Sequence, residues 1–72
     1  MSTEPRLIDA RGLLCPWPAL RLARAAREMR GQGRIKIVAD DPAAPREIEA
    51  ICREHAWGFE RENESEFVIS FD

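Results

Sequence analysis

The spacing of apolar positions changes several times along the chain, and each change separates two predicted elements. Residues 6–10 form a short run that is typical of a strand, and Gly12 then breaks it. Between residues 16 and 29 the apolar positions follow the i, i+3, i+4, i+7 spacing of one helical face, which predicts a helix. The glycines of segment 31–33 are expected to end this helix. Its predicted buried positions are Ala19, Leu22, Ala23, Ala26 and Met29.

Residues 34–40 alternate between polar and apolar types and predict a second strand, followed by a second helix. The Asp-Asp-Pro segment at 40–42 suits a helix start, because Asp is a good N-cap and Pro fits the first turn. Pro45 is an alternative start, because the residue before a proline avoids helical dihedrals. This helix is expected to run to about His55. The core-facing positions are Ile35, Ile37 and Ala39 on the strand and Ile48, Ile51, Cys52 and His55 on the helix.

Two more strands are predicted after Gly58, which closes the helical region. One begins at Phe59, and residues 63–65 form a hairpin turn. The element order is therefore β-α-β-α-β-β. The predicted fold class is α/β (α+β), a two-layer sandwich with two helices packed on one face of a four-stranded mixed sheet. The first two strands should be parallel and the hairpin antiparallel. The last strand is expected to point inward at Phe67, Ile69 and Phe71.

The length of the chain limits what kind of site it contains. A protein of 72 residues buries only about 60% of its unfolded surface, so residues 1–72 are expected to form one domain with a thin core. Such a domain acts through one exposed residue or through a surface. No apolar run approaches the roughly 20 residues that span a bilayer, and no signal peptide is visible at the N-terminus. We therefore expect a cytoplasmic protein, in which free thiols persist.

The net charge of −2 hides an uneven distribution. Residues 1–36 hold eight Arg or Lys against three acidic residues, whereas residues 37–72 hold three Arg against ten acidic residues. One interpretation is a basic face that meets an acidic partner. The alternative is that each helix simply presents a solvated charged face.

The chain has two cysteines, Cys15 and Cys52, and a single histidine, His55. The absence of a Cys-x-x-Cys spacing and the presence of only one histidine argue against a zinc site and against a Cys–His–Asp catalytic triad. No site for a cofactor is apparent. Cys52 falls on the apolar stripe of the second predicted helix and is interpreted as core. A disulfide between the two is not expected in a reducing compartment.

Cys15 stands where a strand gives way to a helix. Pro16 suits the first helical position, which places Cys15 at the N-cap, although Ser, Thr, Asp or Asn would cap better. The positive end of the helix favours a thiolate, and Arg11 is expected to add to this effect. The two prolines leave only the N–H of Trp17 to donate to sulfur. We therefore expect a modestly activated, exposed nucleophile; the alternative is a small buried apolar residue.

The segment 7–18, Leu-Ile-Asp-Ala-Arg-Gly-Leu-Leu-Cys-Pro-Trp-Pro, resembles the signature of the TusA (SirA-like) family of sulfur-carrier proteins. The similarity continues in Ala-Asp-Asp-Pro-Ala at 39–43 and extends over nearly the whole chain. The resemblance implies the fold order given above and assigns motif-shaping positions to Gly12, Pro16 and Pro18. It implies that Cys15 is the catalytic residue of a sulfurtransferase, accepting sulfane sulfur as a persulfide without a cofactor.

The same resemblance implies protein partners. These are a sulfur donor such as a cysteine desulfurase or rhodanese and an acceptor protein, in tRNA thiolation, molybdenum-cofactor supply or sulfur oxidation. Trp17 occupies the variable motif position, where it either anchors a partner or covers the sheet edge. The chain is expected to be a monomer, and direct contact with tRNA is disfavoured by the negative net charge. The expected partner-binding residues are Arg11, Trp17 and the helix arginines Arg21, Arg24, Arg27 and Arg30.

Two other functions fit the sequence. A regulatory or interaction module would use Cys15 to sense oxidation, but a sensor thiol needs a nearby resolving cysteine, and only Cys52 is available. A small RNA-binding α/β domain would make Cys15 incidental.

Overall fold

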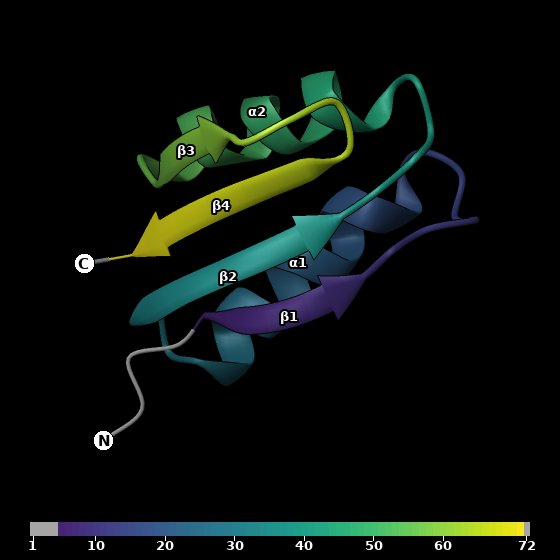
Figure 1. Cartoon of the computed structure of the whole chain (residues 1–72). Coiled ribbons are helices and arrows are strands. Elements are labelled where there is room, and N and C mark those ends of the chain that lie inside the picture. Colours follow the sequence, from purple (N-terminus) through teal and green to yellow (C-terminus); the bar gives the residue numbers. More distant parts are fainter. Residues whose placement is uncertain (1–4, 72) are drawn as a thin grey trace.

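A computed structural model describes residues 5–71, which form six elements in the predicted order. Figure 1 shows strands and helices alternating as far as the end of the second helix, followed by two strands. The predicted α+β class is confirmed. The elements are β1 (Arg6–Asp9), α1 (Trp17–Glu28), β2 (Gly33–Val38), α2 (Ala44–His55), β3 (Gly58–Arg61) and β4 (Glu66–Phe71).

The strands form one four-stranded sheet in the order β1-β2-β4-β3. β1 pairs with β2 in parallel, and β3 pairs with β4 in antiparallel fashion, as predicted; β4 also pairs with β2 in antiparallel fashion, which was not predicted. The last strand therefore enters between β2 and β3, and β1 and β3 are the two edges of the sheet. The carboxyl ends of β1 and β2 consequently lie at the same end of the molecule, where both helices begin (Figure 1).

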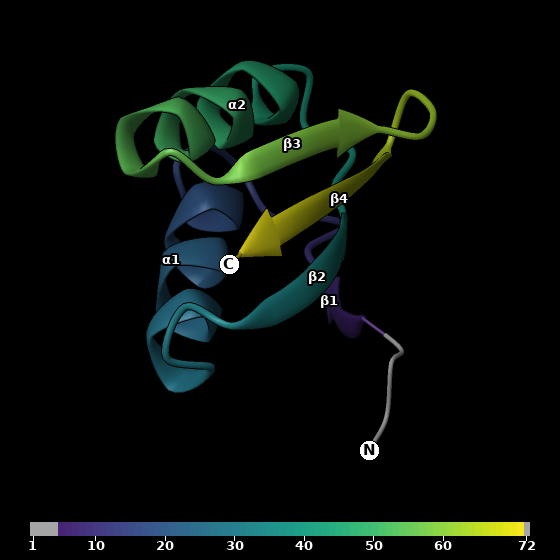
Figure 2. The same ribbon diagram turned by 90° about the vertical axis from the view of Figure 1, so that its left-hand side faces the viewer.

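Both helices cover the same face of the sheet, and the core lies between the two layers (Figure 2). The predicted alternation is confirmed, since all six inward-facing positions are buried. They are Ile35 and Ile37 on β2, Ala39 just after it, and Phe67, Ile69 and Phe71 on β4. The helices contribute Leu22 and Ile48, which are both fully buried. No polar or charged residue among the described ones is buried, so burial of apolar surface holds the two layers together. None of the described helices has the length and apolar character needed to cross a membrane.

The first helix begins one residue later than predicted. α1 starts at Trp17, and Pro16 is its N-cap residue, without a capping side-chain hydrogen bond. Pro18 lies in the first turn, where its missing N–H has no helical partner to lose. The buried stripe includes Ala25 instead of the predicted Ala23, which is partly exposed. The spacing fixed the period of the helix, whereas its rotation against the sheet decided which alanine is covered.

α1 also ends earlier than predicted, at Glu28, with Met29 as C-cap. Arg30 adopts a left-handed backbone (φ 57°), and the N–H groups of Arg30 and Gly31 bond to the carbonyls of Arg27 and Ala26. This is the Schellman pattern that commonly closes helices, here with an arginine in the position that glycine usually takes. The reversal therefore begins before the segment 31–33 that the sequence indicated.

α2 starts at Ala44, with Pro45 accommodated in its first turn. Neither predicted start is therefore right: the helix begins two residues after Pro42, and Pro45 does not delay it. Ile48 and Cys52 are buried as expected, with Ile51 partly buried. His55 is exposed and stacks on Trp57 at a ring separation of 4.5 Å, so its assignment to the buried stripe was wrong.

Replacing Ile37 with alanine tests the position of the core. Ile37 is fully buried on the central strand β2, so Ile37→Ala is expected to lower the free energy of unfolding by about 2–5 kcal/mol, measured by urea denaturation. Leu20→Ala is the control, because Leu20 is 50% exposed on α1; its effect should be much smaller. Equal losses for both variants would contradict this core.

Candidate functional site

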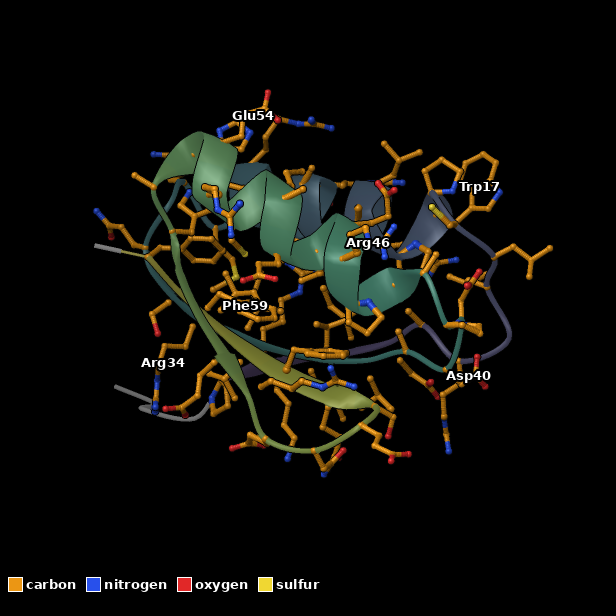
Figure 3. All side chains as sticks on the ribbon, turned by 90° about the horizontal axis from the view of Figure 1, so that it is seen from above. Trp17, Arg34, Asp40, Arg46, Glu54 and Phe59 are labelled. Atoms are coloured by element: carbon orange, nitrogen blue, oxygen red, sulfur yellow. The ribbon has the colours of Figure 1, made fainter. Side chains whose placement is uncertain are left out.

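The candidate site lies at the end of the molecule where β1 and β2 finish and α1 and α2 begin. Two loops meet there: residues 10–16, which carry Cys15, and residues 39–43, which carry two aspartates. Figure 3 shows Asp40 and Trp17 at this end and Arg34 at the opposite end. The meeting of these loops follows from the parallel pairing of β1 with β2, because parallel strands place their carboxyl ends side by side.

The two aspartates hold the cysteine loop through its backbone. Asp40 Oδ1 accepts a hydrogen bond from the N–H of Gly12 (3.0 Å), and Asp41 Oδ2 accepts one from the N–H of Cys15 (2.7 Å). The second oxygen of Asp41 accepts the N–H of Ala43 (2.8 Å) within its own loop. These bonds from Ala43 and Cys15 lower the pKa of Asp41. Asp41 therefore ties the two loops together while it remains ionised.

Gly12 has a structural reason to be glycine. Its φ of +81° lies in the left-handed region, although the space around it is open. A side chain would therefore be disfavoured by backbone conformation and not by a clash. The chain turns here so that the N–H of Gly12 points at Asp40. Its predicted role in shaping the loop remains a prediction, and this geometry supports it.

The thiol of Cys15 is partly exposed, in contrast to the other cysteine. Cys52 is 1% exposed, and burial together with Glu49 raises its pKa to about 11. The interpretation of Cys52 as core is therefore confirmed. Both cysteines are free thiols, and the peptide bond between Cys15 and Pro16 is cis. The chain thus offers one accessible thiol at the meeting point of its two loops.

The pKa of the Cys15 thiol is raised, not lowered. Partial burial is the main cause, and the carboxylate of Glu47 adds to it through its charge and by accepting a hydrogen bond from the thiol; the charge of Asp41 contributes further. The sequence-based expectation of an activated thiol was therefore wrong for this structure. Glu47 lies in the first turn of α2, and sequence reasoning missed it because it is distant along the chain from Cys15.

Both residues that were expected to stabilise a thiolate are engaged elsewhere. The N–H of Trp17 donates to the carbonyl of Leu14 (2.9 Å). Arg11 forms a two-pronged ion pair with Asp9, from Nε to Oδ1 and from Nη2 to Oδ2, each at 2.9 Å. This pair lowers the pKa of Asp9 to about 2. Cys15 also lies one residue before the helix cap, which places it further from the positive helix end than predicted.

Three large apolar side chains close to Cys15 along the chain are exposed. Leu14 is 71% exposed, Trp17 58% and Leu20 50%, and all three lie on the cysteine loop or in the first two turns of α1. Trp17 projects outward at the start of α1 (Figure 3). Of the two roles foreseen for Trp17, the exposed position favours contact with a partner over covering the sheet. We call Leu14, Trp17 and Leu20 the apolar collar.

The four helix arginines do not form one surface. Arg21 and Arg24 line a groove beside β1, whereas Arg27 and Arg30 line a second groove with His55 and Trp57 at the far ends of the helices. Only the first pair lies on the β1 side of α1. Among residues 5–71 no group of three or more His, Cys, Asp or Glu side chains is arranged to hold a metal ion.

A comparison with protein families identifies one match. The family model described as Sulfurtransferase TusA matches residues 6–71, which is nearly the whole chain. The matched range contains both loops of the candidate site.

Removing the charge of Glu47 tests the electrostatics of the thiol. Because the Glu47 carboxylate raises the pKa of Cys15, Glu47→Gln is expected to shift the pH profile of Cys15 alkylation by iodoacetamide to lower pH. The measurement uses a Cys52→Ala background, so that one thiol reacts. Glu49→Gln is the matched control on the same helix and should leave the profile unchanged. An unchanged or upward-shifted profile for Glu47→Gln would show that Glu47 does not act on the thiol.

Proposed function

This chain belongs to the TusA family of sulfurtransferases, and we propose that Cys15 is the residue on which it carries sulfane sulfur as a persulfide. Members of this family carry or transfer sulfur in relays with partner proteins. The observation that supports Cys15 is its position: it is the accessible one of two thiols, on a loop fixed by Asp40 and Asp41.

The proposed loading step is a thiol–persulfide exchange. Sulfur of Cys15 attacks the terminal sulfur of a donor persulfide, a new S–S bond forms on Cys15, and the donor thiolate leaves. Attack requires loss of the thiol proton, and the hydrogen-bonded carboxylate of Glu47 is placed to accept it. In the second step an acceptor thiolate attacks the outer sulfur, and Cys15 leaves as a thiolate that regains a proton. The two exchanges involve no net oxidation.

The raised pKa fits a carrier that waits between partners. A thiol that stays protonated at neutral pH reacts slowly with oxidants and alkylating agents, because the thiolate is the nucleophile. Glu47 then supplies a proton acceptor when a donor persulfide has been brought into contact. The donor we propose is a cysteine desulfurase or rhodanese-like protein, and the acceptor is a thiol protein of tRNA thiolation, cofactor supply or sulfur oxidation.

The alternatives receive less support from the structure. An oxidation sensor needs a resolving thiol, and Cys52 is 1% exposed in the core. An RNA-binding sheet stacks bases on exposed aromatic side chains. Here the aromatic residues of the strands point toward the helices: Phe67 and Phe71 are buried, and Phe59, in register with buried Ile69, lies on the same face.

Sulfur loading of the intact protein tests the proposal. Reduced protein incubated with a cysteine desulfurase and cysteine, or with a rhodanese and thiosulfate, is expected to gain the mass of one sulfur atom. The gain should disappear in Cys15→Ser and persist in Cys52→Ala, which fills the buried position without a polar group. If neither donor adds sulfur, or if the gain survives in Cys15→Ser, Cys15 is not the carrier residue.

The apolar collar yields a separate prediction about docking. Trp17→Ala is expected to slow sulfur transfer from the protein donor roughly tenfold or more, as for a buried aromatic anchor at an interface. Loading from inorganic polysulfide should be unaffected, because a small donor needs no docking surface. Val68→Ala, on the open face of the sheet, serves as the control in both assays. Equal slowing with both donors would mean that Trp17 acts on the thiol and not on docking.

A further inference from the structure

The edge of β1 that faces away from β2 carries backbone groups without a partner strand. In a parallel ladder alternate residues bond to the neighbouring strand. The N–H of Ala10 donates to the carbonyl of Val38 (2.7 Å), which together with the register assigns Ile8 to the bonded set. The N–H and carbonyl groups of Leu7 and Asp9 therefore point to the free edge. Such an edge is able to accept an additional strand.

A groove runs along this edge. It has a volume of about 480 Å³ and is lined on one side by β1 and on the other by α1. Leu7 lines it and is 65% exposed, which makes it the only large exposed apolar side chain among the described residues outside the apolar collar. An exposed apolar side chain thus stands beside the free backbone hydrogen-bonding groups of β1, as at strand-addition sites. Leu7 alternates with buried Ile8, so its side chain points to the face of the sheet away from α1, where it lies near Lys36.

The charge of the groove is positive. Its lining includes Arg6, Arg21 and Arg24, against the carboxylates of Asp9 and Glu28. Glu28 is shared between Arg6 (2.8 Å) and Arg24 (3.5 Å), and Asp9 is paired with Arg11. Both carboxylates therefore already have guanidinium partners. Arg21 has no ion-pair partner within residues 5–71, so its charge is available to a ligand.

We infer that this groove binds an extended acidic segment of a partner protein, which adds as a strand to the edge of β1. The segment bonds to the backbone of Leu7 and Asp9 and places carboxylates against Arg21 and Arg24. A second copy of this chain offers poorer charge complementarity than an acidic segment, because its edge carries the same net positive charge with Arg21 unpaired within residues 5–71. The positive charge of the groove therefore favours an acidic segment over a second copy of this chain, and specific interfaces commonly combine such attraction and repulsion.

This inference deepens the proposed function, on which it rests for the identity of the partner. β1 leads into the cysteine loop, and α1 leaves it two residues after Cys15. A strand added along β1 is therefore held by the two elements that flank the thiol (Figure 1). Binding of the segment itself requires no sulfur chemistry, so it can be measured whether or not Cys15 accepts sulfur.

The test is a titration of the ¹⁵N-labelled full-length protein with a hexapeptide of alternating Glu and Val. At a peptide concentration about ten times its Kd, hydrogen exchange of the Leu7 and Asp9 amides is expected to slow about tenfold. A peptide with Lys in place of Glu should bind much more weakly. A peptide N-methylated at every peptide bond should give no protection, because it cannot donate to the carbonyls of Leu7 and Asp9 and its methyl groups prevent the close approach of a paired strand.

Two variants locate the binding on the protein. Leu7→Pro removes an edge-facing N–H while leaving the β1–β2 ladder intact, and should weaken peptide binding without preventing sulfur loading from polysulfide. The double variant Arg21→Glu/Arg24→Glu should weaken binding about tenfold, as expected for two exposed ion pairs replaced by repulsions. Arg46→Glu/Arg53→Glu on α2 is the matched control and should bind like the unaltered protein.

Several results would overturn the inference. Equal binding of the Glu and Lys peptides would exclude charge selection, and equal binding of the N-methylated peptide would exclude strand addition. Protection of amides away from β1 would place the peptide elsewhere. If Leu7→Pro fails to fold, the N-methylated peptide provides the same test without altering the protein. If the unaltered protein does not bind the Glu/Val peptide but still accepts sulfur on Cys15, this inference alone is refuted and the proposed function stands.

Discussion

The bond from the backbone N–H of Cys15 to the carboxylate of Asp41 joins the two loops on which the candidate site is built. It is short (2.7 Å), and a neighbouring bond from Gly12 to Asp40 fixes the same loop at a second point. Each contact uses a carboxylate on one loop and a backbone N–H on the other, so the geometry does not depend on the side chain of the cysteine. The thiol is left free to react while the backbone that carries it is held. Bonds to an ionised group are the stronger class of hydrogen bond, which suits them to fixing a loop.

These carboxylates also set the chemistry of the thiol. Partial burial raises the pKa of Cys15 most, and Glu47 in the first turn of α2 and Asp41 in the loop before it raise this pKa further. Asp41 therefore both positions the cysteine and favours its protonated form. The Asp41 carboxylate that positions the cysteine loop thus also lowers the nucleophilicity of the Cys15 thiol when no partner is bound. The persulfide exchange proposed for Cys15 is compatible with this, because reaction is required only when a donor persulfide is present, and the carboxylate of Glu47 already accepts a hydrogen bond from the thiol.

Two surfaces near the thiol, the apolar collar and the groove along β1, differ in the chemistry of the partner that each would contact. The apolar collar lies on the cysteine loop and at the start of α1, where burial against a partner would exclude water from the proposed exchange. The groove along β1 carries a net positive charge, and in the proposed complex it contacts the backbone and carboxylates of a partner segment. A small protein without a deep cavity is thereby able to combine an apolar contact at the reacting sulfur with a charged contact further away. Arg27 and Arg30 lie at the opposite ends of the helices and belong to neither surface.

Much of this arrangement followed from the sequence alone. Alternation at Ile35, Ile37 and Phe67 and the helical spacing around Leu22 predicted the element order, the parallel β1–β2 pair, the β3–β4 hairpin and most of the core, because burial on one face imposes a period on the residues. The insertion of β4 between β2 and β3 came only from the tertiary structure. The distinction between accessible Cys15 and buried Cys52 followed in the same way. Local patterns are sufficient wherever the deciding contacts lie within one element or between elements whose pairing is forced by topology.

The electrostatics of the site were decided by the tertiary structure. Glu47 acts on Cys15 across 32 positions of sequence, and Asp41 across 26. Arg11 was expected to stabilise a thiolate on Cys15 but forms an ion pair with Asp9. The N–H of Trp17 donates to the carbonyl of Leu14 and not to the sulfur. The sequence shows that donors and charges are present near a residue, but each group has several possible partners within reach. Only the folded backbone selects among them, because hydrogen bonds and ion pairs depend on distances that the order of residues does not fix.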